Sequence, residues 1–263
     1  MKVVLVTGAG SGVGKAVAEA LLAGGWRVYG TTRKGVPVSN GIIILPLEVT
    51  DPLSISACIQ EILRREGKLD ALVNNAGMGI AGPLEETPED MAAEQMNVNL
   101  FGAWRAAKEA LPAFRQQGKG RIINISSLAG VIPIPYQGFY SASKAALEIL
   151  FHAMEMETSP WGVKITNLAL GDTRTEFTSH RRCTPGMADG PYGLSAVKSI
   201  AKMEADEQNG MDPRKVGKQV LKLLESRNPP HKAGCGIAAK LILLLQRLLP
   251  GRLVYYIVKK MYT

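Results

Sequence analysis

Residues 3–15 read VVLVTGAGSGVGK, a short apolar run that ends in a glycine-rich turn. A continuous apolar run of this length is typical of a strand buried on both faces of a parallel sheet. Glycines after such a strand let the backbone turn sharply and approach a phosphate, with the amides of a following helix facing the anion. The stretch therefore predicts a strand, a phosphate-binding turn and a helix.

The spacing of these glycines separates three known phosphate motifs. The ATP-type pattern G-x-x-x-x-G-K-[ST] ends correctly at Gly14-Lys15, but Ala9 replaces its first glycine and Ala16 its Mg²⁺-binding hydroxyl. The common dinucleotide pattern G-x-G-x-x-G also fails, because Val13 stands at its third glycine. The pattern that fits is T-G-x-x-x-G-x-G, carried by Thr7, Gly8, Gly12 and Gly14. A purely structural turn is the alternative.

Short β-branched runs alternate with longer helical patterns along the chain. The expected strands are 3–7, 27–32, 42–47, 71–74, 121–126 and 164–169, and the expected helices lie near 13–23, 53–65, 88–115 and 139–157. This alternation predicts a doubly wound α/β sheet with helices on both faces, in one domain that spans residues 1–263. Residues 171–211 are rich in Thr, Gly, Pro and charge, and we expect a substrate loop there.

A basic pair, Arg33-Lys34, follows the second expected strand. In an NAD site, an acidic residue at this position accepts hydrogen bonds from the ribose 2′-hydroxyl. A guanidinium instead clamps a 2′-phosphate, which a carboxylate would repel. We therefore expect NADP(H), with a solvated basic turn as the alternative.

A phenol and an ammonium group stand four residues apart at Tyr140 and Lys144, at the start of a helical pattern. This spacing places both side chains on one helix face, where the cation is expected to lower the tyrosine pKa. Tyr140 is then a candidate acid/base group, although Y-x-x-x-K also occurs by chance.

Polar groups also follow other expected strands. Ser126 and Ser127 end the fifth strand, the sequence NNAG at 74–77 ends the fourth, and Asn99 lies in a helical segment. Because the carboxyl ends of parallel strands gather at one edge of a sheet, we expect these groups to converge there.

In this set of ordered motifs the chain resembles the short-chain dehydrogenase/reductase family over about residues 3–177. The resemblance implies a Rossmann-type domain, usually in a homodimer or homotetramer, with a nicotinamide cofactor. It also implies that Tyr140 donates or accepts the proton, Ser127 bonds the substrate oxygen, Lys144 binds the ribose and lowers the Tyr140 pKa, and Asn99 supports a proton relay. The cofactor contacts that it implies are Gly8, Ser11, Gly12, Val13, Gly14, Arg33, Glu48, Val49, Asn75, Ala76, Gly77, Tyr140, Lys144, Gly171, Thr173 and Thr175.

Three positions depart from the family pattern. Leu170-Gly171 stands where members usually carry Pro-Gly, and Glu48 stands where they generally carry Asp. The expected seventh strand is weakly marked around 231–237, because Gly234 and Gly236 disfavour a strand.

The basic charge is concentrated at the end of the chain. Residues 226–263 hold seven Lys and Arg and no acidic residue, so they carry +7 of the net +8. The apolar runs 241–249 and 253–258 lie in the same segment, which we therefore call apolar and basic over 227–263. Packing on the body or on a second subunit, covering a lipophilic pocket and weak contact with an anionic membrane are the alternatives, and nucleic acid is not expected.

The remaining sequence features limit the possible classes of function. Three scattered cysteines and three histidines give no metal or disulfide pattern, and with no export signal we expect a cytoplasmic enzyme, peripheral to a membrane if the tail binds one. An uncharged lipophilic carbonyl or alcohol (steroid, retinoid or fatty-acyl type) is the expected substrate, and a catalytically silent NADP(H) sensor is the alternative. The candidate pocket residues are Met78, Ile80, Val131, Ile132, Ile134, Tyr136, Phe177 and Tyr192.

Overall fold

The structure, a computed structural model, describes residues 1–35 and 41–262. Within these residues, seven strands form one parallel sheet in the order β3-β2-β1-β4-β6-β7-β9. Their bounds are β1 Val3–Val6, β2 Arg27–Thr32, β3 Ile43–Pro46, β4 Ala71–Asn74, β6 Gly120–Ser127, β7 Val163–Leu170 and β9 Lys232–Cys235. The chain winds outward from β1 in both directions, which confirms the predicted doubly wound sheet. The first six strands match their predicted bounds to within one residue.

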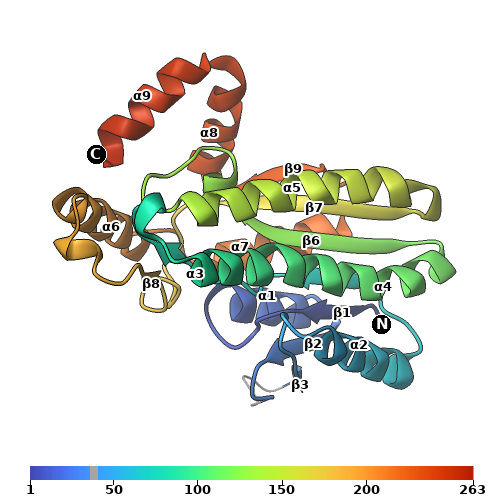
Figure 1. Ribbon diagram of the computed structural model, residues 1–263. Coiled ribbons are helices and arrows are strands. Elements are labelled where there is room, and N and C mark those ends of the chain that lie inside the picture. The colour runs from blue at the N-terminus through green and yellow to red at the C-terminus, as the bar shows by residue number, and fades with distance from the viewer. Residues whose placement is uncertain (36–40, 263) are drawn as a thin grey trace.

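Helices cover both faces of the sheet (Figure 1). Their bounds are α1 Gly12–Ala23, α2 Pro52–Glu66, α3 Glu89–Met96, α4 Ala103–Gln117, α5 Gly138–Thr158, α6 Gly193–Gln208, α7 Pro213–Glu225, α8 Gly236–Leu248 and α9 Gly251–Tyr262. On one face α2, α4 and α5 pack against the sheet, and on the other face α1 and α7 do. Strand β1 shows why both faces are apolar, since Val3 and Leu5 enter the first core and Val4 and Val6 the second.

The predicted helix over 88–115 is divided in the structure. Helices α3 and α4 are joined by a wider π-helical segment, Asn97–Gly102, which contains Asn99. π-helical turns are rare and occur mostly as single bulges inside α-helices, frequently at functional sites. The bulge is a local change in winding that hydrophobic periodicity does not show.

Helices α6 and α7 and the short strand β8 were not predicted, whereas the weakly marked seventh strand is present as β9. The expected loop 171–211 contains α6 and the short strand β8 (Arg182–Cys183), which pairs with β5 (Ile80–Ala81). Helix α7 carries signals that the sequence did offer: Asp212 caps it through Arg214 N at 2.8 Å, and a stripe at Val216 and Val220 packs toward α1. Strand β9 pairs with β7 at the sheet edge, and its Gly234 lies against the backbone of Ala239 in α8, where a Cβ would come within 2.9 Å.

The end of the chain forms two consecutive helices, α8 and α9, which project beyond the carboxyl ends of the strands toward α6 (Figure 1). Among the described residues, no helix combines the length and apolarity needed to span a bilayer. Nor do those residues contain a group of three or more His, Cys, Asp or Glu arranged to hold a metal ion.

Candidate active site

A cleft of about 1480 Å³ lies at the carboxyl ends of the strands. Its lining comes from the turn before α1, the ends of β2, β4, β6 and β7, the start of α5, and helices α8 and α9. Of the predicted site residues, all but Asn99 line it. The volume exceeds the roughly 300–1,000 Å³ that is usual for a small-molecule site, which leaves room for a dinucleotide and a substrate together.

The glycine-rich turn is held in place by the end of β4. Thr7 Oγ1 accepts hydrogen bonds from the backbone amides of Asn75 and Ala76, both at 3.0 Å. Asn75 Nδ2 in turn donates to the carbonyl oxygens of Thr7 and Gly8, both at 2.9 Å. A Cβ on Gly14 would come within 2.1 Å of the Gly8 oxygen, so the turn closes only with glycine at position 14. The two motifs are therefore one structural unit.

The start of α1 fits a phosphate group. Within the described residues, no side chain caps this helix end and no acidic residue stands in its first turn. Its first backbone amides thus have no intrahelical acceptor, and the residues that carry them, Gly12 to Gly14, line the cleft. Such amides, with the helix dipole, bind anions such as the pyrophosphate of a dinucleotide.

The ends of β2 and β3 form the next part of the same wall. Arg33 is exposed on the cleft, two residues after Thr31, whose Oγ1 accepts a hydrogen bond from Gly8 N at 3.2 Å. The Glu48 carboxylate is turned toward Thr50, accepting from its amide at 3.0 Å and its hydroxyl at 2.9 Å. The Arg33 guanidinium therefore lies beside the pocket, and the Glu48 carboxylate already has hydrogen-bond donors in Thr50.

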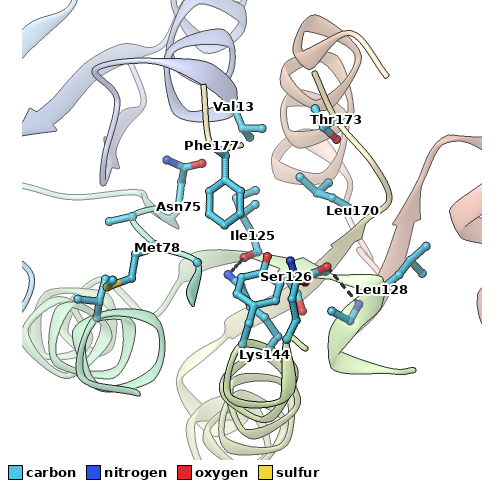
Figure 2. Close-up of a pocket in the computed structure, with 18 of the residues that line it drawn as sticks. Val13, Asn75, Met78, Ile125, Ser126, Leu128, Lys144, Leu170, Thr173 and Phe177 are labelled. Carbon is cyan, nitrogen blue, oxygen red and sulfur yellow. Dashed lines mark hydrogen bonds between the residues drawn. The ribbon is translucent and has the colours of Figure 1, made fainter. Parts of the chain in front are cut away.

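Helix α5 and the end of β6 bring the predicted catalytic groups together. The Ser127 hydroxyl lies close enough to the Tyr140 hydroxyl to lower its pKa, and Ser127 Oγ accepts a hydrogen bond from Ala129 N at 3.1 Å. Lys144 Nζ lies 5.7 Å from the centre of the Tyr140 ring and donates to Ile125 O at 2.9 Å. Figure 2 shows Lys144 on the opposite side of the view from Val13 and Thr173, with the Phe177 ring below Val13.

The electrostatics of this group are dominated by burial. Burial raises the Tyr140 pKa to about 12, and the nearby Ser127 hydroxyl only partly opposes this. Burial also lowers the Lys144 pKa to about 8, with the Glu148 carboxylate acting against the change. Burial therefore dominates the Tyr140 pKa in this structure, and the lowering of that pKa by Lys144 stays a prediction. At neutral pH the phenol keeps its proton.

Asn99 lies one layer behind the cleft surface, with 2% of its surface exposed. Its Oδ1 accepts from Met78 N at 2.9 Å, and its Nδ2 donates to Met78 O at 3.0 Å and to Ser143 Oγ at 3.2 Å. In this structure it ties the segment after β4 to α5 rather than facing the pocket.

The segment after β7 contains predicted site residues and one ion pair that the sequence did not indicate. Gly171, Thr173 and Thr175 line the cleft in spite of the missing Pro-Gly pair. The Phe177 ring packs 5.9 Å from that of Tyr140, measured between centres. Behind it the buried Arg181 pairs with Glu207 of α6, a contact that joins residues 26 apart and leaves no local pattern.

The candidate substrate residues divide into two groups. Met78, Ile132, Ile134 and Phe177 line the cleft, as proposed. The other four do not line it. Tyr136 and Tyr192 pack against a small separate core under α6, Ile80 is 3% exposed within β5, and Val131 is half-buried after Gly130. Apolar character alone did not separate pocket residues from core residues.

Helices α8 and α9 close the outer side of the cleft with apolar side chains. We call these residues the tail wall: Ile242, Leu245 and Leu249 from the α8 segment, and Val254, Ile257, Val258 and Met261 from α9. The covering of the pocket by the tail was one of the alternatives, and the structure supports it. The cleft therefore joins a polar, backbone-rich inner end to an apolar outer end.

This combination of phosphate-binding turn and Ser–Tyr–Lys group defines a dinucleotide-dependent oxidoreductase. The family described as short chain dehydrogenase matches residues 2–185, and the chain belongs to this family.

Individual relatives agree with the assignment. The chain is 37% identical to a 3-ketodihydrosphingosine reductase of Bacteroides thetaiotaomicron, over all of this chain and 98% of that protein. A short-chain dehydrogenase of Streptomyces avermitilis has the same fold with a TM-score of 0.84 and 31% identity, covering 94% of this chain and 92% of its own. An alcohol dehydrogenase of Thermococcus sibiricus complexed with 5-hydroxy-NADP superposes with a TM-score of 0.71 and 25% identity, over 89% and 95% of the two chains.

Proposed function

We propose that this protein reduces the ketone group of a long-chain lipophilic substrate with NADPH. The observation that carries the proposal is the placement of the Tyr140 and Ser127 hydroxyls at the inner end of a cleft whose outer side is apolar. A general acid must hold its proton before the reaction, and a tyrosine hydroxyl does so at neutral pH.

The chemistry follows from the positions of these groups. NADPH, when bound, supplies the hydride for the carbonyl carbon. The Ser127 and Tyr140 hydroxyls donate hydrogen bonds to the carbonyl oxygen, on which negative charge develops. Tyr140 then transfers its proton to that oxygen, which completes the alcohol. Lys144, next to the ring, stabilises the phenolate that is left until a proton returns.

The preference for NADPH is supported by Arg33. Its guanidinium stands on the cleft after β2, where the ribose next to the adenine is expected in a doubly wound sheet. A 2′-phosphate at this place gains charge-assisted hydrogen bonds from the guanidinium.

The substrate class is supported by two observations. The relative that aligns over all of this chain is named for a ketone on a long-chain base. The tail wall and Tyr140 line the same cleft. The tail wall therefore offers an apolar surface on which the alkyl chain of a long-chain ketone can pack.

The test is NADPH consumption with three ketones: 3-ketodihydrosphingosine, a long-chain ketone without the amine, and a short water-soluble ketone. We expect kcat/KM to rise with chain length and to be highest for the first. Faster reduction of the short ketone would contradict the substrate class. Binding of NADPH without turnover of any ketone would instead favour the NADP(H) sensor.

A further inference from the structure

Helix α8 carries two apolar stripes that face different surroundings. Ile242, Leu245 and Leu249 belong to the tail wall and face the cleft. A second stripe, Ile237, Leu241, Leu244 and Leu248, recurs at intervals of four, three and four residues, which places it on one helix face. Since successive residues are about 100° apart around a helix, the two stripes point in different directions. We call the second set the outer stripe.

The outer stripe is exposed to solvent. Ile237 is 87% exposed, Leu244 54% and Leu248 69%, so α8 presents a row of large aliphatic side chains outside the molecule. Single exposed apolar residues are ordinary on protein surfaces, but a contiguous row indicates an interaction site.

Helix α9 adds aromatic and basic side chains to the same projecting unit. Tyr255 and Tyr256 are 65% and 62% exposed, and Arg252, Lys259 and Lys260 are exposed on the same helix. Tyrosine is enriched where a bilayer meets water, because its ring is apolar and its hydroxyl polar. Lysine and arginine stems lie along apolar surface while the charge stays in the headgroup region.

The charge of the segment selects among the surfaces that would cover this stripe. Residues 226–263 carry +7 with no acidic residue, so two copies meeting face to face would bring like charges together. An anionic lipid surface attracts the same charges. Helices α8 and α9, of 13 and 12 residues, are too short to cross a bilayer but have the length and composition of helices that lie in its surface.

We propose that the outer face of α8 and α9 binds the surface of an anionic membrane, with the outer stripe inserted among the lipids. Because the inner faces of these helices form the tail wall, the cleft then opens next to the acyl chains. A long-chain ketone can move from the bilayer into the pocket without passing through water. The binding itself is independent of the proposed function, whereas this delivery of substrate rests on it.

Vesicle flotation tests the binding. The full-length protein is mixed with vesicles of phosphatidylcholine alone or with 30% phosphatidylglycerol (roughly the range in which anionic lipids recruit basic segments), at low and at high salt. We expect binding to the anionic vesicles that weakens with salt. Equal binding to both compositions, or no binding to either, would overturn the proposal.

Two matched variants locate the binding surface. Leu244→Ser with Leu248→Ser changes only the outer stripe, and we expect a loss of vesicle affinity of about tenfold or more. The control, Leu53→Ser with Met156→Ser, changes residues that are 80% and 73% exposed on α2 and α5, and should bind as the wild type. If the outer-stripe variant keeps its affinity but turns an oligomer into a monomer in sedimentation, a second copy covers the stripe and the proposal fails.

Activity separates delivery from chemistry. The outer-stripe variant should reduce a short soluble ketone at the wild-type rate. Its rate on a vesicle-embedded ketone should be at least about tenfold lower than that of the wild type. Equal rates on the embedded ketone would overturn the delivery step. A wild-type protein that floats with anionic vesicles but reduces no ketone would leave the membrane surface intact and refute the proposed function alone.

Discussion

The two ends of the cleft are built in opposite ways. At the inner end, a catalytic wall formed by residues 7–14, 74–77, 125–127 and 140–144 is mostly buried or half-buried, and hydrogen bonds cross-link it between β1, β4, β6 and α5. At the outer end, the tail wall stands on two projecting helices whose other side is exposed (Figure 1). Hydride and proton transfer need atoms held within fractions of an ångström, whereas an alkyl chain needs only apolar area. The difference follows from these two requirements.

The largest expected contrast is in stability and compares two leucines. Leu72 in β4 is 0% exposed and lies in the core under the catalytic wall, whereas Leu248 in α8 is 69% exposed. We expect Leu72→Ala to lower the free energy of unfolding by about 2–5 kcal/mol, because it leaves a cavity. Leu248→Ala should change it by less than about 0.5 kcal/mol. Urea unfolding of both variants measures this, and similar losses would show that α8 is as tightly packed as the sheet.

A second contrast compares substitutions at two glycines, and the measured quantity is the affinity for NADPH. A Cβ at Gly14 meets the Gly8 oxygen at 2.1 Å and Asn75 Nδ2 at 2.4 Å, while at Gly251 no described atom comes within 4 Å. Overpacking of this kind costs about 1–3 kcal/mol, so Gly14→Ala should weaken NADPH binding about tenfold to a hundredfold. Gly251→Ala should bind as the wild type in the same fluorescence titration. Unchanged affinity in Gly14→Ala would mean that the turn does not hold the pyrophosphate.

A third contrast compares two arginines. Arg33 lines the cleft after β2, and Arg252 is exposed on α9. Loss of charge-assisted bonds to a 2′-phosphate should make Arg33→Ala bind NADPH about 10–100-fold more weakly, with little change for NADH. Arg252→Ala should bind both cofactors normally. An equal loss for NADPH and NADH in Arg33→Ala would place the 2′-position away from this guanidinium.

The difference between the two ends of the cleft also explains how much the sequence could predict. The glycine turn is readable because its constraint is local: Gly14 is required by Gly8, six residues earlier, and Asn75 adds a polar anchor at a strand end. Strands β1 and β4 are readable because every residue in them is buried, so both faces are apolar. These features carry their physical cause in the residues themselves.

The remaining features depend on contacts between distant parts of the chain. Strand β9 contains Gly234 because the α8 backbone passes over it, which no strand propensity indicates. The spacing of Tyr140 and Lys144 predicted their proximity correctly, but their pKa values follow from burial, which spacing does not show. The pairing of Arg181 with Glu207 is likewise a product of folding.

The central claim is that Tyr140 is the proton donor for ketone reduction, and one variant tests it most directly. Tyr140→Phe removes the hydroxyl and keeps the ring against Phe177, so NADPH affinity and the free energy of unfolding should stay near those of the wild type. Loss of a general acid typically costs about 10²–10⁴-fold in rate, and kcat for the reduction of 3-ketodihydrosphingosine should fall by that amount. A Tyr140→Phe enzyme that binds NADPH and reduces this ketone at the wild-type rate would contradict the account.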